Sequence, residues 1–475
     1  MGKAKRLLSN TAILGVGTFA SKLLVFLMMP LYTSVLSSTQ FGVADILTQT
    51  ANLLIPFACI GICDAIFRFV LDTGDEYGDD RKKIFSCGAA VLAIGSVLIA
   101  ALVQILRVFD IFHGYVGLVA AYVIFANLHS AAANFVRAEG KNVLFVSQGI
   151  ANTALTVILN IVFLVVFDMG TLGYVLSVVV ADAAMTVFLV FAAKLYKYFS
   201  FRHIKKETVV SMLRFSIPYI PTTVMWLITS ASDRYIVVAY GSAAENGLYA
   251  AAYKLPTLLL LVCGVFIEAW QFSIVKEDGE GREKFFSDVF KNYAGIIFIG
   301  ASVLIAGAKI ATGLLMAPSY YESWRYVPIL VLAMTFSALV SFFGSVYFFE
   351  KKSVMSMLTA MSGAIINIVL NFVLIPKHGA IGAAVATFIS YFAVFVIRAY
   401  DTKFYVKFNM HTVRVAINGA VLLIQAIIMV SQISYWKYIQ LACVAFILIF
   451  NGREIMIAIS QFIKNARKTK KIEKN

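Results

Sequence analysis

The sequence predicts an all-α polytopic membrane protein with fourteen transmembrane helices, arranged as two six-helix lobes plus two extra C-terminal helices. Hydrophobic residues make up 61% of the 475 residues and charged residues only 14%, whereas soluble domains average about 45–50% and about 25%. Continuous apolar runs recur that are long enough to cross a hydrocarbon core of about 30 Å. Their continuity argues against β-strands, which would alternate.

The apolar runs follow one another through short connections that leave no room for a soluble domain. The predicted spans are 10–36, 42–70, 84–107, 114–136, 143–167, 171–193, 211–240, 247–275, 288–316, 324–349, 354–376, 380–400, 411–431 and 435–461. The basic start MGKAKRLLSN has no small-residue cleavage site after it, so we expect a retained first helix.

Basic residues predict the orientation of the spans. With the N-terminus inside, 32 of the 40 Lys and Arg residues lie on inside segments, 5 on outside segments and 3 within helices. This asymmetry predicts an N-in/C-in topology. It also explains most of the net charge of +15, so we expect no nucleic acid partner. The tail KNARKTKKIEKN is expected to lie against anionic lipid.

An internal repeat predicts the two lobes. A shift of 211 residues places FVRAEGKNVLFV (135–146) on VYFFEKKSVMSM (346–357), so that Glu139 meets Glu350. Because the repeated unit is six helices, both copies start on the same side and are related by a pseudo-two-fold axis along the membrane normal. The predicted divisions are an N-terminal lobe 1–200, a C-terminal lobe 201–405, and helices 13–14 with a basic cytoplasmic tail, 406–475.

A second echo links STQFGVADIL (38–47) to AAENGLYAAA (243–252). The chain resembles the MOP flippase superfamily in these two segments and in two connectors. The segments lie within PLYTSVLSSTQFGVADIL and SDRYIV…G…ENGLYAAAYKL, and the connectors are RAEGKN and EKKS. The closest branch is the polysaccharide transporters, the Wzx-type oligosaccharide-lipid flippases. The resemblance covers nearly the whole chain.

The resemblance implies two lobes around a central cavity that opens alternately to the two sides of the membrane. It implies a substrate of the undecaprenyl-diphosphate-linked saccharide type, flipped from the cytoplasmic to the outer leaflet for cell-surface polysaccharide biosynthesis, such as O-antigen or capsule. A bacterial or archaeal plasma membrane and a polysaccharide polymerase partner are implied with it. The coupling energy stays open among H⁺, Na⁺ and the membrane potential.

Charges at membrane depth are the candidate site residues, because each costs at least about 2.5–3.5 kcal/mol at the bilayer centre unless a cavity or partner receives it. In the hairpin of spans 211–240 and 247–275, Asp233 and Lys254 lie at equal depth, about 15 Å from the turn. We expect a cavity ion pair, whether purely structural or also orienting Arg234. Arg234 is then an uncompensated cation that contacts a substrate anion or snorkels to the outer interface.

Two lysines join Arg234 as candidate anion contacts. Lys22 lies about 18 Å into the first span with no acid nearby in sequence, and Lys309 lies in the outer half of span 288–316. Because a diphosphate loses hydration in a low-dielectric region, fixed cations on its path would offset the cost. The alternatives are a buried pair with a distant acid for Lys22 and snorkelling for Lys309.

Two titratable groups near helix centres are candidates for coupling. Asp182 has no local partner, and we expect it to carry a proton, to pair with Lys22 or to hydrogen-bond a neighbouring helix. His129 either titrates near neutrality or is a satisfied packing residue.

Nearer the cytoplasmic ends, Asp64 and Arg68 are four residues apart and are expected to pair. Glu268, nearly repeat-equivalent to Asp64, is a candidate gate or proton site. The five cysteines lie in apolar segments without a CxxC pair or a histidine cluster. We therefore expect no disulfide, no metal and no cofactor.

Three other functions compete with the flippase. A cation-coupled multidrug exporter of the same superfamily favours an acid-rich cavity, which the cations at depth argue against and Asp182 favours. A membrane glycan-handling enzyme needs a substantial outer loop with catalytic groups, whereas the outer loops here are a few residues long. We therefore expect a transporter and not an enzyme. A structural assembly protein of the cell envelope is the fourth interpretation.

Overall fold

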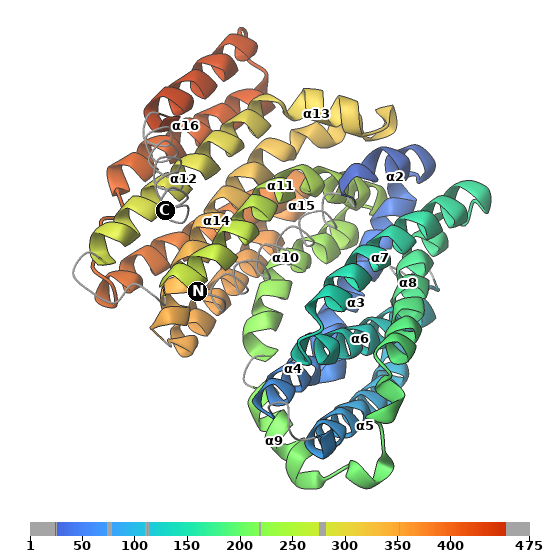
Figure 1. The fold of residues 1–475 in the computed structure, drawn as a ribbon. Helices are drawn as coiled ribbons and strands as arrows, with labels where there is room; N and C mark the ends of the chain where they lie inside the picture. The colour runs from blue at the N-terminus through green and yellow to red at the C-terminus, as the bar shows by residue number, and fades with distance from the viewer. Residues whose placement is uncertain are drawn as a thin grey trace, which may run out of the picture. The chain divides into compact units, whose positions relative to one another are not determined.

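The computed structural model describes residues 24, 26–73, 78–109, 112, 114–217, 220–274, 282–350 and 352–452 (Figure 1). Within these residues every regular element is helical. The α-helices are α2 (Met29–Val35), α3 (Ser38–Cys59), α4 (Ile62–Asp72), α5 (Gly78–Leu102), α6 (Val116–Ala138), α7 (Asn142–Ile161), α8 (Gly170–Ala192), α9 (Lys206–Ser216), α10 (Ile220–Tyr240), α11 (Ala243–Ile274), α12 (Arg282–Ala306), α13 (Ala308–Leu315), α14 (Val327–Phe349), α15 (Ser353–Asp401) and α16 (Thr412–Ser431). Shorter turns are η1 (Val103–Val108), η3 (Val162–Val166), η4 (Leu195–Lys197), η5 (Phe201–His203), η7 (Pro318–Arg325) and η8 (Thr402–Phe404).

The protein is a multi-pass membrane protein. Ten helices of the described part are long and apolar enough to cross a membrane, and a shorter apolar helix follows at Trp436–Gly452. The predicted spans 114–136 and 171–193 match α6 and α8 to within two residues. Most of the predicted span 10–36 lies outside the described residues. The total of fourteen and the N-in/C-in orientation therefore stay predictions.

Two backbone breaks interrupt the long helices. The predicted continuous span 42–70 is wrong, because Ile60 and Gly61 adopt left-handed φ angles of 50° and 65° and separate α3 from α4. Within α15, Gly379 (φ 55°, ψ −142°) is non-helical three residues after Pro376. This second break falls between the predicted spans 354–376 and 380–400, where a connection was expected.

The chain divides into two compact units, Met1–Ala250 and Ala251–Asn475. In the first unit α6 packs against α3, α4 and α8, while α9 packs on α4 and α5 and α10 packs on α3. These contacts place α9 and α10 in the first unit, beyond the predicted lobe boundary at residue 200. In the second unit α14 packs against α12, α15 and α16. The lobe boundaries, which come from the repeat, stay predictions.

Candidate functional site

A charged cluster lies inside the first unit, where α3, α10 and the start of α11 meet. It consists of Asp45, Asp233, Arg234, Asn246 and Tyr249, and we call it the Arg234 cluster. Arg234 is 5% exposed, and Asp233, Asn246 and Tyr249 are each 0% exposed. Since charged side chains are almost never this buried unless they are paired, the geometry of the pairing decides what the cluster can do.

The guanidinium of Arg234 lies between two carboxylates. Its Nε donates to Asp45 Oδ2 at 2.7 Å, and one terminal nitrogen lies 3.5 Å from Asp233 Oδ1. Tyr249 Oη donates to Asp233 Oδ2 at 2.6 Å. Asn246 Nδ2 donates to Gly42 O at 3.0 Å, and its Oδ1 has no hydrogen-bond partner among the described residues. The cluster thus brings one cation within ion-pair distance of two acids inside the first unit.

Two glycines permit this approach of α3 and α11. A Cβ on Gly42 would lie 1.8 Å from the Ala243 carbonyl oxygen, and a Cβ on Gly247 would lie 1.9 Å from the Ser38 carbonyl oxygen. Small residues let helix backbones come this close inside membranes. Gly42 and Gly247 occupy matching positions in the two segments that echo each other in sequence, so these segments pack on one another around Asp45.

The expectation that Arg234 is an uncompensated cation is wrong, because Asp45 and Asp233 both lie within ion-pair distance of it. The snorkelling alternative is also wrong for this structure, since the side chain is buried in protein. Lys254 is half-buried in the part of α11 that belongs to the second unit. Its pairing with Asp233 stays a prediction.

A second polar cluster joins α6, α7 and α8, and we call it the His129 cluster. His129 Nδ1 lies 2.9 Å from Asp182 Oδ1, and His129 Nε2 lies 2.7 Å from Gln148 Oε1. Asn152 Nδ2 donates to Asp182 Oδ1 at 2.9 Å. Asp182 and Gln148 are 7% and 4% exposed. The alternative in which Asp182 hydrogen-bonds neighbouring helices is therefore confirmed.

The ring of His129 faces an oxygen acceptor at each nitrogen. Only the imidazolium form donates from both nitrogens, so this arrangement suits a protonated ring beside a carboxylate. A neutral ring keeps both contacts only if the Gln148 amide turns so that its Nε2 donates to the ring. The cluster therefore joins α6, α7 and α8 through one titratable ring.

A cavity of about 380 Å³ opens beside the break between α3 and α4. Residues of α9 and α10 close one side, and the polar lining residues are Asn52, Asp64, Asn127, Ser130, Ser216 and Thr223. Asn127 is 3% exposed and donates to Ile55 O at 3.3 Å, while its Oδ1 has no hydrogen-bond partner among the described residues.

The predicted Asp64–Arg68 pair does not form. Arg68 instead pairs with Asp72 at 3.4 Å, with both side chains more than half exposed. Asp64 lines the cavity beside the helix break. Lys22 and the side chain of Glu268 lie outside the described residues, so their assigned roles stay predictions.

Lys309 lies on the short helix α13 in the second unit. Its Nζ is 4.3 Å from the ring centroid of Trp324 and 4.9 Å from that of Trp436. Tryptophan is typical of membrane interfaces, and cations are attracted to its ring face. This geometry favours the snorkelling alternative over a cavity contact.

The RAEGKN connector is fixed by a buried acid. Gly140 turns the chain with φ 77°, and the Glu139 carboxylate, 3% exposed, lies 2.8 Å from Lys141 Nζ and 3.7 Å from Arg81. Tyr198 Oη donates to Glu139 at 2.6 Å, and this hydrogen bond raises the pKa of Tyr198. The motif therefore ties the α6–α7 turn to α5 and to the chain after α8.

Sequence reasoning missed Asp45 and Gln148 as partners. Asp45 lies 189 residues before Arg234, but it belongs to the repeated segment STQFGVADIL, and that repeat was the available signal. Among the described residues no group of three or more His, Cys, Asp or Glu side chains could hold a metal ion.

The chain matches one protein family by sequence and several solved membrane transporters by structure. A family described as "Polysaccharide biosynthesis protein" matches residues 7–272, more than half of the chain. No curated protein sequence matches it. The solved lipid II flippase MurJ, in an inward closed conformation, is similar with a TM-score of 0.70 and 16% identity, over 94% of this chain and 99% of that one.

Two other solved structures are similar. An inward-facing multidrug resistance MATE family transporter of the MOP superfamily gives a TM-score of 0.66 at 11% identity, over 80% of this chain and 94% of that one. A MOP superfamily transporter from Pyrococcus furiosus gives 0.58 at 11%, over 83% and 95%. At these identities the likeness concerns the fold.

Proposed function

The chain belongs to the polysaccharide biosynthesis protein family, and from that premise we propose that it is a flippase of the MOP type for lipid-linked oligosaccharides. It moves a polyprenyl-diphosphate-linked oligosaccharide from the cytoplasmic to the outer leaflet of a bacterial or archaeal plasma membrane, for cell-surface polysaccharide biosynthesis. The family match carries the proposal. The fold shared with the lipid II flippase over 94% of this chain supports it.

The physical task of such a flippase is to carry a hydrated, anionic headgroup past hydrocarbon. Alternating access solves it when two lobes expose one polar cavity to each side in turn. Fixed cations then offset the hydration that the diphosphate loses. Lys22 remains the candidate first contact, and Arg234 reaches the diphosphate only by exchanging Asp45 for it.

The cavity beside the α3–α4 break is suited to sugar hydroxyls. The side chains of Asn52, Asn127 and Ser130 offer hydrogen-bonding groups at its wall, and Asp64 adds a carboxylate. Neither group selects one sugar over another. The cavity therefore serves headgroup binding in general.

The His129 cluster is the candidate coupling site. Protonation lets the ring donate to Asp182 on α8 and Gln148 on α7 at once, and deprotonation requires the Gln148 amide to turn if both contacts are kept. A bound proton thus favours one packing of three helices over another, which is what coupling to transport needs. A proton gradient is the energy source that this geometry supports.

A multidrug exporter is the second candidate, and one observation favours it. Among the described residues two acids, Asp45 and Asp233, lie within ion-pair distance of Arg234, and acids at membrane depth suit a cationic substrate. The similarity to a MATE family transporter concerns the fold and fits either function.

Reconstitution in liposomes separates the candidates. Purified protein is compared for translocation of a fluorescent polyprenyl-diphosphate oligosaccharide and for uptake of a cationic dye, each with and without a proton gradient. We expect movement of the labelled oligosaccharide and no dye uptake. Dye uptake without oligosaccharide movement would contradict the flippase proposal and support the exporter. An Ala151→Phe variant, altered on an exposed face of α7, should match the unaltered protein.

A further inference from the structure

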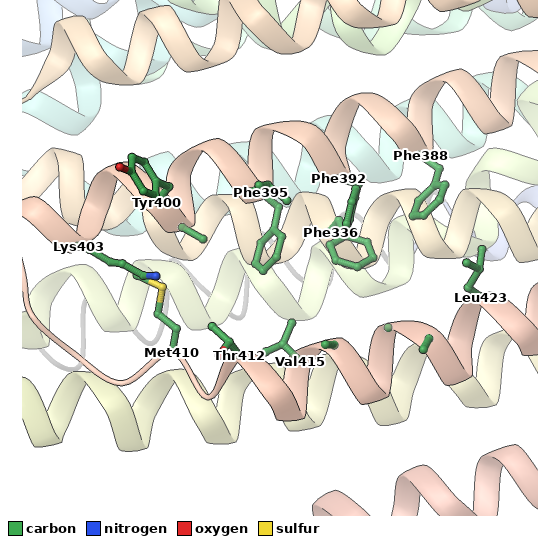
Figure 2. Close-up of a pocket in the computed structure, with 15 residues that line it drawn as sticks. Phe336, Phe388, Phe392, Phe395, Tyr400, Lys403, Met410, Thr412, Val415 and Leu423 are labelled. Carbon is green, nitrogen blue, oxygen red and sulfur yellow. The ribbon is translucent and has the colours of Figure 1, made fainter.

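A cavity of about 630 Å³ lies within the second unit, in a groove between α15 and α16 over α14 (Figure 2). Small-molecule sites are typically about 300–1,000 Å³. Phe388 and Leu423 lie at one end of the groove, and Lys403 and Met410 lie at the other. Lys403 is the one charged side chain among the described residues that line it.

The groove exists because bulky side chains on α15 face small side chains on α16. Phe388, Phe392 and Phe395 project from one face of α15, and their ring centroids lie 5.0–5.9 Å from that of Phe336 on α14. The facing helix α16 carries small side chains that leave the space unfilled. These are Ala416, Gly419 and Ala420.

The lysine end of the groove opens into a second, polar cavity of about 650 Å³. The two cavities share Lys403, Met410 and Thr412. The polar one adds Lys284 and Lys407, against the single acid Glu283. All three lysines are exposed, and none is in an ion pair within the described part of the chain. The apolar groove therefore ends at an opening lined by Lys284, Lys403 and Lys407, which we call the basic mouth.

The loop that carries Lys407 is held in place by its neighbour. The ring of Phe408 lies 5.8 Å from Phe286 and 6.0 Å from Phe290 by centroid distance. The Asn409 backbone N–H also donates to Ser287 Oγ at 2.8 Å. Because these contacts fix the loop, the basic mouth is formed before anything binds.

We propose that the groove and its mouth bind an anionic phospholipid, with one acyl chain along the phenylalanine wall and the phosphate at Lys403 and Lys407. Thr412 and Leu423 are separated by about 16 Å along α16, which is half of a hydrocarbon core of about 30 Å. The groove thus matches one acyl chain of one leaflet. The lysines supply the complementary charge. The predicted orientation makes this the cytoplasmic leaflet.

The site is independent of the proposed transport function. A polyprenyl chain is branched along its length and exceeds one leaflet, so it fits the groove less well than a linear acyl chain. A bound phospholipid would fill the space between α15 and α16 and stabilise the second unit. Its headgroup would be selected by charge.

Native mass spectrometry and thermal unfolding of the purified protein with added phosphatidylglycerol, phosphatidylcholine or inorganic phosphate test this. We expect retained phosphatidylglycerol and a raised Tm with that lipid alone. Each lysine near a membrane surface contributes about fivefold to binding of an anionic lipid. Lys403→Gln with Lys407→Gln should therefore weaken retention by roughly 25-fold, and Ala420→Phe should block it by filling the groove.

Lys194→Gln with Lys197→Gln changes exposed lysines in the first unit and should leave retention unchanged, as should Ala151→Phe. Equal retention of phosphatidylcholine, or a Tm rise with inorganic phosphate alone, would overturn the proposal. Displacement of phosphatidylglycerol by a polyprenyl phosphate would assign the groove to the substrate instead. Failure of oligosaccharide translocation in liposomes would leave the lipid result standing, because the two assays are separate.

Discussion

The guanidinium of Arg234 is shared between Asp45 on α3 and Asp233 on its own helix, and this sharing determines what each substitution costs. Removing the cation takes the guanidinium away from two carboxylates at once. Removing Asp45 alone leaves the cation with Asp233. The cluster is therefore a buried ion pair with a second acid beside it. Breaking a buried pair lowers the free energy of unfolding by more than a surface pair contributes to it.

Arg234→Gln should lower the free energy of unfolding by about 3–5 kcal/mol, because it strands two buried acids. The double variant with Asp45→Asn should recover part of that loss. Arg325→Gln is the matched control, since its pair with Glu322 has the same 2.7 Å distance but is more than half exposed, and it should cost about 0–1 kcal/mol. Denaturant unfolding in micelles measures all three. Equal losses for Arg234 and Arg325 would contradict the buried lock.

The His129 cluster makes a separate prediction about pH. Asp182→Asn removes the charge that the imidazolium faces at 2.9 Å, so proton binding should no longer be tied to helix packing. We expect oligosaccharide transport to lose about 5–150-fold of its stimulation by a proton gradient, and the pH profile to become flat. His129→Gln should behave alike. A retained pH profile in both variants would remove this cluster from the coupling mechanism.

At the scale of elements, contact between α3 and α11 depends on two glycines rather than on large side chains. Both glycines face a backbone carbonyl of the other helix at a distance that admits no Cβ. The break at Ile60 and Gly61 is equally local, since left-handed backbone angles end α3. Each of these is a backbone requirement, and a hydropathy pattern carries no information about it.

Gly42→Ala should destabilise the protein by about 1–3 kcal/mol or more, because its Cβ would overlap the Ala243 carbonyl. Gly149→Ala in α7 is the matched control, since nothing lies within 4 Å of its Cβ position. It should be neutral or stabilising by up to about 1 kcal/mol, as alanine favours a helix. Thermal unfolding of the two variants gives the comparison. A neutral Gly42→Ala would mean that α3 and α11 are not in close contact.

For the whole molecule, the sequence predicted what depends on local composition. Hydropathy predicted the helices, and α6 and α8 begin and end where expected. Charge at depth singled out Arg234, Asp182 and His129, all of which lie in polar clusters. Their partners could not be predicted, because Asp45 is on a distant helix and only packing decides which faces meet. The same limit explains why Arg234 was expected to lack a partner.

The orientation of the molecule in the membrane is the last prediction, and it follows from charge alone. Lys197 lies on a connection expected to be inside and Glu322 on one expected to be outside; both are exposed. In a Cys443→Ala background, the four remaining cysteines are buried and should not react. Membrane-impermeant maleimide on intact cells should then label Glu322→Cys and spare Lys197→Cys until the cells are opened. The reverse pattern would invert the topology, and with it the leaflet assigned to the lysines beside the α15–α16 groove. The predicted topology places the two connections on opposite sides, because an odd number of predicted spans separates them. Labelling of both from outside would contradict that prediction.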